Sequence, residues 1–410
     1  NGFIPGYAGP GYTPGYSASG APAPFVNAPP STLPPPTGPV PGGTGSILGS
    51  PTEPLVPLEI QANETQTGKL MLGVGVNSDA GLVGNFVYDE QNFDIRRLPR
   101  SWEDVSNGTA WRGDGERLRI EADPGTLVQR YIATYMVPYI FHTQYQFDVS
   151  GFYFTRIYED WSEGRVGGNV GLGYQIAPDL SAHIGFDGER VDVYNPHTPT
   201  PPELEAALGH NDRYGFSASI AHDTRDSPFL PTQGHLLSFK FEQVVGSFVY
   251  PHGEITGQQY FLLHQRADGS GRHVLGISGI LGVTGSDTPI YDNYFAGGFS
   301  TLRGFAFRGA SPTVDDVQVG GQFEALGTVE YMFPITADDA LRGVVFCDFG
   351  TVEQNVSFHS NQFRAAPGVG LRITVPAMGP APIALDLAFP VASAPGDQIQ
   401  NFSFNIGLAR

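Results

Sequence analysis

Two arginines, Arg303 and Arg308, lie in the stretch YFAGGFSTLRGFAFRG, residues 294–309, which contains no carboxylate to balance them. Aromatic residues and glycines, including Gly297 and Gly304, make up most of the rest of this stretch. A guanidinium group is a planar fork that can bind two carboxylates through charge-assisted hydrogen bonds. Glycine allows backbone conformations that a Cβ would forbid. Binding of this kind requires acidic side chains from other segments of the chain.

Two acidic residues follow this stretch, each inside a segment of alternating polarity. In TVEYMF, Val329 and Tyr331 share one face, so Glu330 lies on the other. In VVFCDFG, Cys347 and its apolar neighbours share one face, so Asp348 lies on the other. If the apolar faces point outwards, both carboxylates point inwards. The sequence places no cation on these two segments, so we expect the carboxylates to lack a partner from a neighbouring strand.

The same period of two recurs from about residue 66 to the end of the chain. In YGFSASIAH, residues 214–222, and HLLSFKFEQ, residues 235–243, aromatic and aliphatic side chains alternate with small or polar ones. Roughly sixteen segments of about ten residues show this pattern, which is the length a transmembrane strand requires. Short turns and longer polar loops join them in alternation. The pattern predicts an all-β protein, a transmembrane antiparallel β-barrel of about 16 strands. A soluble double-sheet sandwich is the alternative, but its strands are shorter.

The composition limits the classes of function. The 410 residues include 54 Gly and 35 Pro, and 15% of them are charged, which is low for a soluble domain. The net charge of −19 argues against a nucleic-acid partner, because phosphate contacts need clustered Lys and Arg. Cys347 is the one cysteine, so an intramolecular disulfide and a zinc site of the zinc-finger type are excluded by count. We expect no metal and no cofactor.

The chain divides into two segments of different composition. Residues 1–58 are rich in Pro and Gly, repeat the tripeptide PGY and hold one charged residue, Glu53. Such a segment buries too little apolar surface to fold, so we expect a linker or disordered tail. A proline-rich docking ligand is the alternative. Residues 59–410 are predicted to form the barrel.

The stretch GGFSTLRGFAFRG resembles the Arg-Gly-Phe loop of the BamA family of outer-membrane assembly factors. Further stretches resemble other parts of that family in the same order. They are DTRDSPFLPTQGHLLSF (223–239), VGGQFEALGTVEYMFP (319–334), VVFCDFGTV (344–352), GVGLRITVPAMGPAPIALDLAFPV (368–391) and FSFNIGLAR (402–410). The resemblance covers about residues 66–410. Residues 1–58 do not resemble the POTRA domains that precede the barrel in that family.

The resemblance implies a sixteen-stranded barrel whose loop, residues 285–320, folds back into the lumen. It also supplies Arg303 as the partner of both Glu330 and Asp348, with Gly304 and Phe305 completing the loop motif. A buried ion pair that loses one member is destabilised by about 3–5 kcal/mol. The alternative for Arg303 is a solvated loop cation.

The function implied by the resemblance is the insertion of other β-barrel proteins into the bacterial outer membrane, which breaks no covalent bond and needs no enzyme. Gly73 and Gly75 in the first strand and Gly407 in the last weaken those strands, so the seam between them is expected to open most easily. An opened edge can pair with an incoming strand. The predicted seam residues are Leu70, Leu72, Val74, Val76, Phe402, Phe404, Ile406 and Leu408.

The expected partners are unfolded outer-membrane proteins, outer-membrane lipid, and accessory lipoproteins or periplasmic proteins. A two-partner polypeptide secretion pore of the same superfamily is the first alternative, and a passive porin is a weaker one. A hydrolase is a third class. Its candidate histidines are His142, His210, His222 and His235, but the sequence has no G-x-S-x-G elbow.

Overall fold

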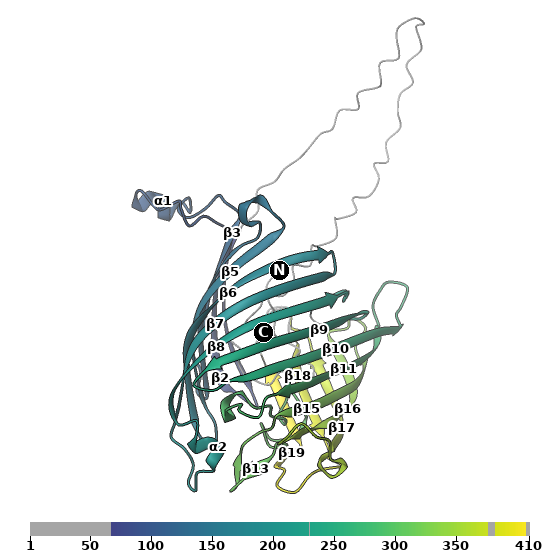
Figure 1. The fold of residues 1–410 in the computed structure, drawn as a ribbon. Helices are drawn as coiled ribbons and strands as arrows, with labels where there is room; N and C mark the ends of the chain where they lie inside the picture. Colours follow the sequence, from purple (N-terminus) through teal and green to yellow (C-terminus); the bar gives the residue numbers. More distant parts are fainter. Residues whose placement is uncertain (1–66, 229, 376–381, 407–410) are drawn as a thin grey trace, which may run out of the picture.

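The computed structural model describes residues 67–228, 230–375 and 382–406. These residues form a closed antiparallel barrel of 16 strands, drawn in Figure 1, and the predicted fold class is confirmed. Each strand of the barrel pairs with its neighbour in the chain, and the last strand pairs with the first. The proline-rich segment, residues 1–58, lies outside the described residues.

The strands of the barrel wall, in order, are β1 (Gly68–Asn77), β2 (Gly81–Phe93), β3 (Glu116–Asp123), β4 (Val128–Val137), β5 (Tyr145–Ile157), β6 (Ser162–Ala177), β7 (Leu180–Tyr194), β8 (Gly209–Asp223), β9 (Gly234–Gly246), β10 (Tyr250–His264), β11 (His273–Thr284), β15 (Phe323–Pro334), β16 (Leu341–Glu353), β17 (Arg364–Ile373), β18 (Ile383–Ala388) and β20 (Phe402–Ile406). Short elements lie in the connections. They are α1 (Trp102–Ser106), η1 (Ile140–His142), α2 (Pro202–Glu205), η2 (Ile290–Asp292), β12 (Gly304–Phe305), β13 (Thr313–Val314), β14 (Val317–Gln318), η3 (Ser360–Gln362) and β19 (Ile399–Gln400).

The wall is apolar outside and polar inside, as the alternation predicted. On β8, the side chains of Tyr214, Phe216 and Ile220 are exposed on the outer face. Arg213 and Ser217 alternate with them and are buried on the inner face. This is the arrangement of a transmembrane barrel, in which apolar side chains face the lipid and polar side chains face the interior. No helix in the described part of the chain is long and apolar enough to cross a membrane.

The connections differ at the two ends of the barrel. The segment between β11 and β15, residues 285–322, is long and contains η2, β12, β13 and β14. Figure 1 shows β13 and β19 at the same end as α2, while α1 lies at the opposite end. The loop of residues 285–322 therefore starts from the end of the barrel that also carries the connection between β18 and β20.

The junction between β1 and β20 closes the barrel. Within the described residues it pairs Val76 with Ile406 and Asn77 with Asn405, and the Ser78 N–H donates to Phe404 O at 3.1 Å. By contrast, β1 pairs with β2 along its whole length, from Gly68 to Asn77. The register of this pairing places the described end of β20 opposite the last residues of β1, next to the turn that leads to β2.

Candidate functional site

The loop of residues 285–322 is packed among side chains of the barrel wall. Leu302 and Phe305 are 0% and 1% exposed. They belong to one buried cluster with Val344 and Phe346 of β16. Loop residues in water would be exposed, so the packing fixes the loop against the inner surface of the wall.

Arg303 lies in this loop and binds Asp348 of β16 with two guanidinium nitrogens. Its Nε donates to Asp348 Oδ2 at 2.7 Å and its Nη2 donates to Asp348 Oδ1 at 2.8 Å. The Arg303 backbone N–H also donates to Asp348 Oδ2, at 3.0 Å. On its flat face, the guanidinium lies 3.4 Å from the centroid of the Phe346 ring. This bidentate geometry is the strong form of the charge-assisted pair.

The remaining nitrogen of Arg303 reaches two more carboxylates. Nη1 donates to Glu330 Oε2 at 3.0 Å and to Asp386 Oδ2 of β18 at 3.3 Å. Burial lowers the pKa of Arg303, but Asp348, Glu330 and Asp386 outweigh it and raise that pKa well above its ordinary value. The arginine is therefore a permanent cation, and the structure brings it together with Glu330 and Asp348.

The expectation that no strand cation lies near these carboxylates is wrong. Arg372 of β17 donates to Asp386 Oδ1 at 2.6 Å and to Glu330 Oε2 at 3.4 Å. The cluster thus holds two guanidinium groups and three carboxylates. Arg372 of the wall therefore pairs with Glu330 and Asp386 independently of the loop. Arg303 of the loop adds the second cation, which also binds Asp348.

Gly304 and Phe305 follow Arg303 as the strand β12. Gly304 has a φ of +97°, and a Cβ added there would lie 3.1 Å from Ala366 Cβ and from Pro390 Cγ. A side chain at this position is therefore unfavourable, because it would strain the backbone and crowd these two residues. Gly304 and Phe305 pair with Gln400 and Ile399 of β19, just ahead of β20.

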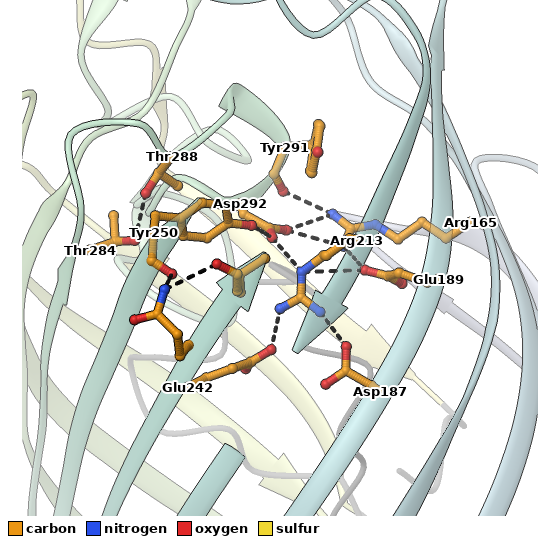
Figure 2. Close-up of polar contacts among 12 residues, drawn as sticks. Arg165, Asp187, Glu189, Arg213, Glu242, Tyr250, Thr284, Thr288, Tyr291 and Asp292 are labelled. Carbon is orange, nitrogen blue, oxygen red and sulfur yellow. Dashed lines mark hydrogen bonds and ion pairs between the residues drawn. The ribbon is translucent and has the colours of Figure 1, made fainter. Parts of the chain in front are cut away.

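A second charged cluster, shown in Figure 2, binds the same loop near its start and was missed by the sequence analysis. Asp292 of η2 accepts from Arg165 Nη1 of β6 at 3.1 Å and from Arg213 Nε of β8 at 2.9 Å. The hydroxyl of Tyr250 on β10 also donates to Asp292. Further buried carboxylates bind the two arginines, and they are Glu163, Asp187, Glu189 and Glu242.

The signal for this cluster was present in the strand pattern. Tyr214 and Phe216 point outwards on β8, so the alternation places Arg213 inwards, and the same rule applies to Arg165 on β6. Burial raises the pKa of Asp292, but Arg213 and Arg165 outweigh burial and hold it below its ordinary value. Asp292 is therefore an anion bound by wall cations, whereas Arg303 is a cation bound by wall anions.

Arg308, the second arginine of the glycine-rich stretch, contacts aromatic rings. Its guanidinium lies 3.7 Å from the centroid of Phe295 and 3.8 Å from that of Tyr158. Trp161, in the connection from β5 to β6, lies on the same cation at 5.2 Å. Burial lowers the pKa of Arg308 to about 10. The loop is thereby packed against the connection from β5 to β6 as well.

The predicted seam residues lie on β1 and β20. Leu70, Leu72 and Val74 are 61%, 75% and 66% exposed, and Val76 pairs with Ile406. The rings of Phe402 and Phe404 stack at 5.8 Å. Leu408 lies outside the described residues. That these residues form an opening stays a prediction.

The histidines named as hydrolase candidates fall into different places. His222 and His235 are hydrogen-bonded at 2.7 Å, and His222 also contacts Asp179 at 3.0 Å. His210 pairs with Asp192 on the exposed surface. His142 is the last residue of η1. His210 and His222 lie near opposite ends of β8, so the described side chains of these candidates do not form one site.

One group of described acidic residues has the spacing of a metal site. The carboxylate oxygens of Asp94, Asp114 and Glu116 lie within 4.8 Å of one another, where the connection from β2 enters β3 at Glu116. Glu116 Oε2 already accepts the N–H of Ile95 at 3.0 Å. The group therefore takes part in the hydrogen bonding of this connection.

Relatives among known proteins share this barrel. A BamA outer-membrane protein assembly factor of Neorickettsia risticii is 23% identical over 363 residues, which is 85% of this chain and 46% of that protein. The SAM50-like protein CG7639 of Drosophila melanogaster is 26% identical over 279 residues, 65% of this chain and 60% of that protein. The chain spans less than half the length of the first of these relatives.

Solved structures agree on the fold. BamA from Haemophilus ducreyi lacking POTRA domains 1–3 superposes with a TM-score of 0.68 at 19% identity, covering 84% of this chain and 70% of that one. CdiB from Acinetobacter baumannii gives a TM-score of 0.52 at 14% identity, covering 82% of this chain and 59% of that one. The Omp85 superfamily domain matches residues 110–409, so most of the barrel is included. Because this match covers more than half of the chain, the chain belongs to the Omp85 superfamily.

Proposed function

We propose that this barrel folds and inserts other β-barrel proteins into the bacterial outer membrane, through the junction between β1 and β20. The observation that carries the proposal is that the barrel closes between its first strand, β1, and its last, β20, and that β1 contains Gly73 and Gly75, which weaken a strand. A strand that enters hydrocarbon unpaired leaves N–H and C=O groups without partners, at several kcal/mol each. An edge that opens readily supplies those partners.

The exposed apolar edge of β1 supports this role. Leu70, Leu72 and Val74 point outwards and would remain in lipid while the backbone of β1 pairs with a client strand. The partners are then unfolded outer-membrane proteins and membrane lipid, with accessory lipoproteins or periplasmic proteins delivering the clients. The BamA relatives are named outer-membrane protein assembly factors, which agrees with this role.

In this proposal, the cluster around Arg303 keeps the wall beside the seam rigid. Arg303 joins the loop to Asp348 of β16 and to Asp386 of β18. Strand β18 pairs with β20, so the cluster stabilises the side of the seam formed by β18 and β20. The reaction is one of strand exchange and breaks no covalent bond.

A disulfide across the seam tests the proposal. The variant carries Val76→Cys and Ile406→Cys, with Cys347→Ser to remove the native thiol; these two positions face each other in the register. Opposite residues on paired strands lie within the Cα separation that a disulfide allows. The readout is the fraction of an unfolded barrel client that folds into lipid vesicles containing the purified protein.

We expect the oxidised variant to insert clients no faster than empty vesicles, and reductant to restore the rate. The matched control is Val345→Cys with Val369→Cys, which lies across the fully paired junction of β16 and β17. Its disulfide should leave the rate unchanged. Full insertion by the oxidised seam variant would refute the proposal.

A second candidate is a polypeptide secretion pore of the same superfamily, which conducts its substrate through the lumen. The same variant separates the two, because a pore through the lumen keeps its transport when the seam is locked. A passive porin is distinguished by steady conductance in a planar bilayer.

A further inference from the structure

The tip of the loop contacts the hairpin that begins the barrel. The backbone N–H of Phe299 donates to Asp79 Oδ2 at 3.0 Å, across a separation of 220 residues in the chain. Asp79 lies in the turn between β1 and β2, directly after the residues of β1 that pair with β20. Gly298 has a φ of +97°, and a Cβ there would lie 2.7 Å from Asp79 Oδ2. The backbone of the loop therefore approaches the turn closely.

Arg156 of β5 strengthens this contact from the wall. Its Nη2 donates to the backbone oxygen of Asp79 at 3.0 Å. Its guanidinium also lies 4.0 Å from the centroid of Phe307 in the loop. One wall arginine thus touches both the first hairpin and the loop.

The same loop is attached to the opposite side of the seam. Arg303 binds Asp386 of β18, the strand that pairs with β20. The Ala306 N–H donates to Gln398 O at 2.9 Å, and β12 pairs with β19 just before β20 begins. Residues 299–306 of the loop therefore connect the hairpin of β1 with the strands that end the barrel.

The two attachments differ in strength. On the side of β18 and β20, the loop is held by buried ion pairs and by backbone pairing with β19. On the side of β1, the loop is held by backbone hydrogen bonding to the half-buried carboxylate of Asp79, beside the packing of Phe307 on Arg156. When the two sides separate, the contact at Asp79 is therefore the first to break.

We propose that the loop of residues 285–322 is a latch across the seam, and that Asp79 is the residue by which it holds β1. In the closed barrel, the Phe299 N–H and Asp79 add a contact beside the pairing of β1 with β20. Loss of that contact frees the hairpin of β1 and β2 to move outwards while the loop stays bound to β16 and β18. In the proposed insertase, this latch would control when the seam opens. That role rests on the proposed function, but the latch itself does not, because opening of the seam can be measured without a client.

The test measures the width of the seam. Spin labels are placed at Leu82→Cys on β2 and Leu387→Cys on β18, in the Cys347→Ser background of the full chain in lipid nanodiscs. Both positions are exposed on the outer wall, at 52% and 44%. Their distance distribution is recorded by pulsed electron–electron double resonance, with no client present.

Asp79→Ala should raise the ratio of the long-distance to the short-distance population by roughly tenfold, the effect of losing one hydrogen bond to a charged group. The turn itself should persist, because Asn77 Oδ1, and not Asp79, accepts the N–H groups of residues 79 and 80, at 2.9 and 2.6 Å. Asp79→Asn keeps an acceptor oxygen and should give a smaller shift.

Asp338→Ala is the matched control, since Asp338 is also a turn carboxylate but accepts from Ala340 in the connection of β15 and β16. It should leave the distances unchanged. Gly298→Ala is the second variant, which pushes the loop off Asp79 without altering the carboxylate, and should open the seam as Asp79→Ala does. Distances that stay those of the unmodified protein in both Asp79→Ala and Gly298→Ala overturn the latch. Widened distances in a protein that inserts no client would uphold the latch and refute the insertase.

Discussion

Asp292 and Arg303 carry opposite charges on one loop, and each is bound by the opposite charge on a different part of the barrel wall. Asp292 accepts from Arg165 and Arg213 on β6 and β8. Arg303 donates to carboxylates on β15, β16 and β18. Exchange of the two partners would place like charges together. The two charges therefore hold the loop inside the barrel and also determine which part of the loop lies against which strands.

Removing the Arg303 side chain should destabilise the barrel strongly. In Arg303→Ala, buried Asp348 loses both of its guanidinium bonds, and we expect the free energy of unfolding to fall by about 3–5 kcal/mol. Urea unfolding in detergent micelles measures the change. Arg190→Ala is the control, because Arg190 forms an exposed ion pair with Asp212 and should leave the midpoint where it is. Equal midpoints for Arg303→Ala and Arg190→Ala would contradict the assigned role.

Release of the loop should require the loss of both charged contacts. Arg308 is 3% exposed, so trypsin should cut there slowly in the unmodified protein. Asp292→Asn and Arg303→Ala each leave the loop bound at the other cluster, and each should raise the rate of cleavage after Arg308 only modestly. The double variant should be cut rapidly, because proteolysis follows the population of the released loop. Mass spectrometry of the fragments gives the rate. Rapid cutting in either single variant would show that one cluster alone holds the loop.

Acid should loosen the start of the loop. The pKa of Asp292 is held below its ordinary value of 3.8, so its stabilisation is present above pH 3.8 and is lost as the pH falls through the lower, folded value. The groups that face Asp292 are Arg165, Arg213, Glu189, Tyr250 and His252.

Hydrogen exchange of residues 290–296, corrected for the intrinsic effect of pH, should therefore report protection that drops only in strong acid. Asp292→Asn should show weaker protection at neutral pH and no further loss in acid. Protection that vanishes in the unmodified protein near pH 6 would instead assign the loosening to another group.

A methyl group at Gly304 should strain the loop next to the cation. The φ of +97° is unfavourable for alanine, and the new Cβ would contact Ala366 and Pro390. Gly304→Ala should reduce the free energy of unfolding by about 1–3 kcal/mol. Gly257→Ala on β10 is the matched control, because a Cβ there meets no atom within 4 Å and the backbone is extended. Its unfolding midpoint should change little, and a shift as large as that of Gly304→Ala would remove strain as the explanation.

The sequence carried enough information to place the wall. Because side chains alternate strictly on a strand, Val329 and Tyr331 were sufficient to turn Glu330 inwards, and the structure places it there. The same rule applied to Leu371 and Leu387 would have turned Arg372 and Asp386 inwards and revealed the rest of the cluster. The contact between these two residues, by contrast, depends on the pairing of β17 with β18, which the alternation alone does not state.

The contacts of the loop with Asp79 and through Asp292 could not be predicted from the alternation of side chains. Asp79 and Asp292 lie in segments without a period, so nothing in the local pattern states which way their side chains point. Their partners lie far along the chain and are brought near only by the path of the loop through the barrel. The resemblance supplied the contact of Arg303, but it supplied neither Asp79 nor Asp292.

The contact of Phe299 with Asp79 also has a consequence for how this barrel itself reaches its native state. Its two residues are separated by 220 positions, and Arg303 needs Asp386, which is synthesised after the loop. Contacts at such separation form late, since the entropy of closing a long chain segment opposes them. Docking of the loop and closure of the barrel are therefore expected to occur together, late in folding. Until the last strands are in place, the binding site for the loop is incomplete.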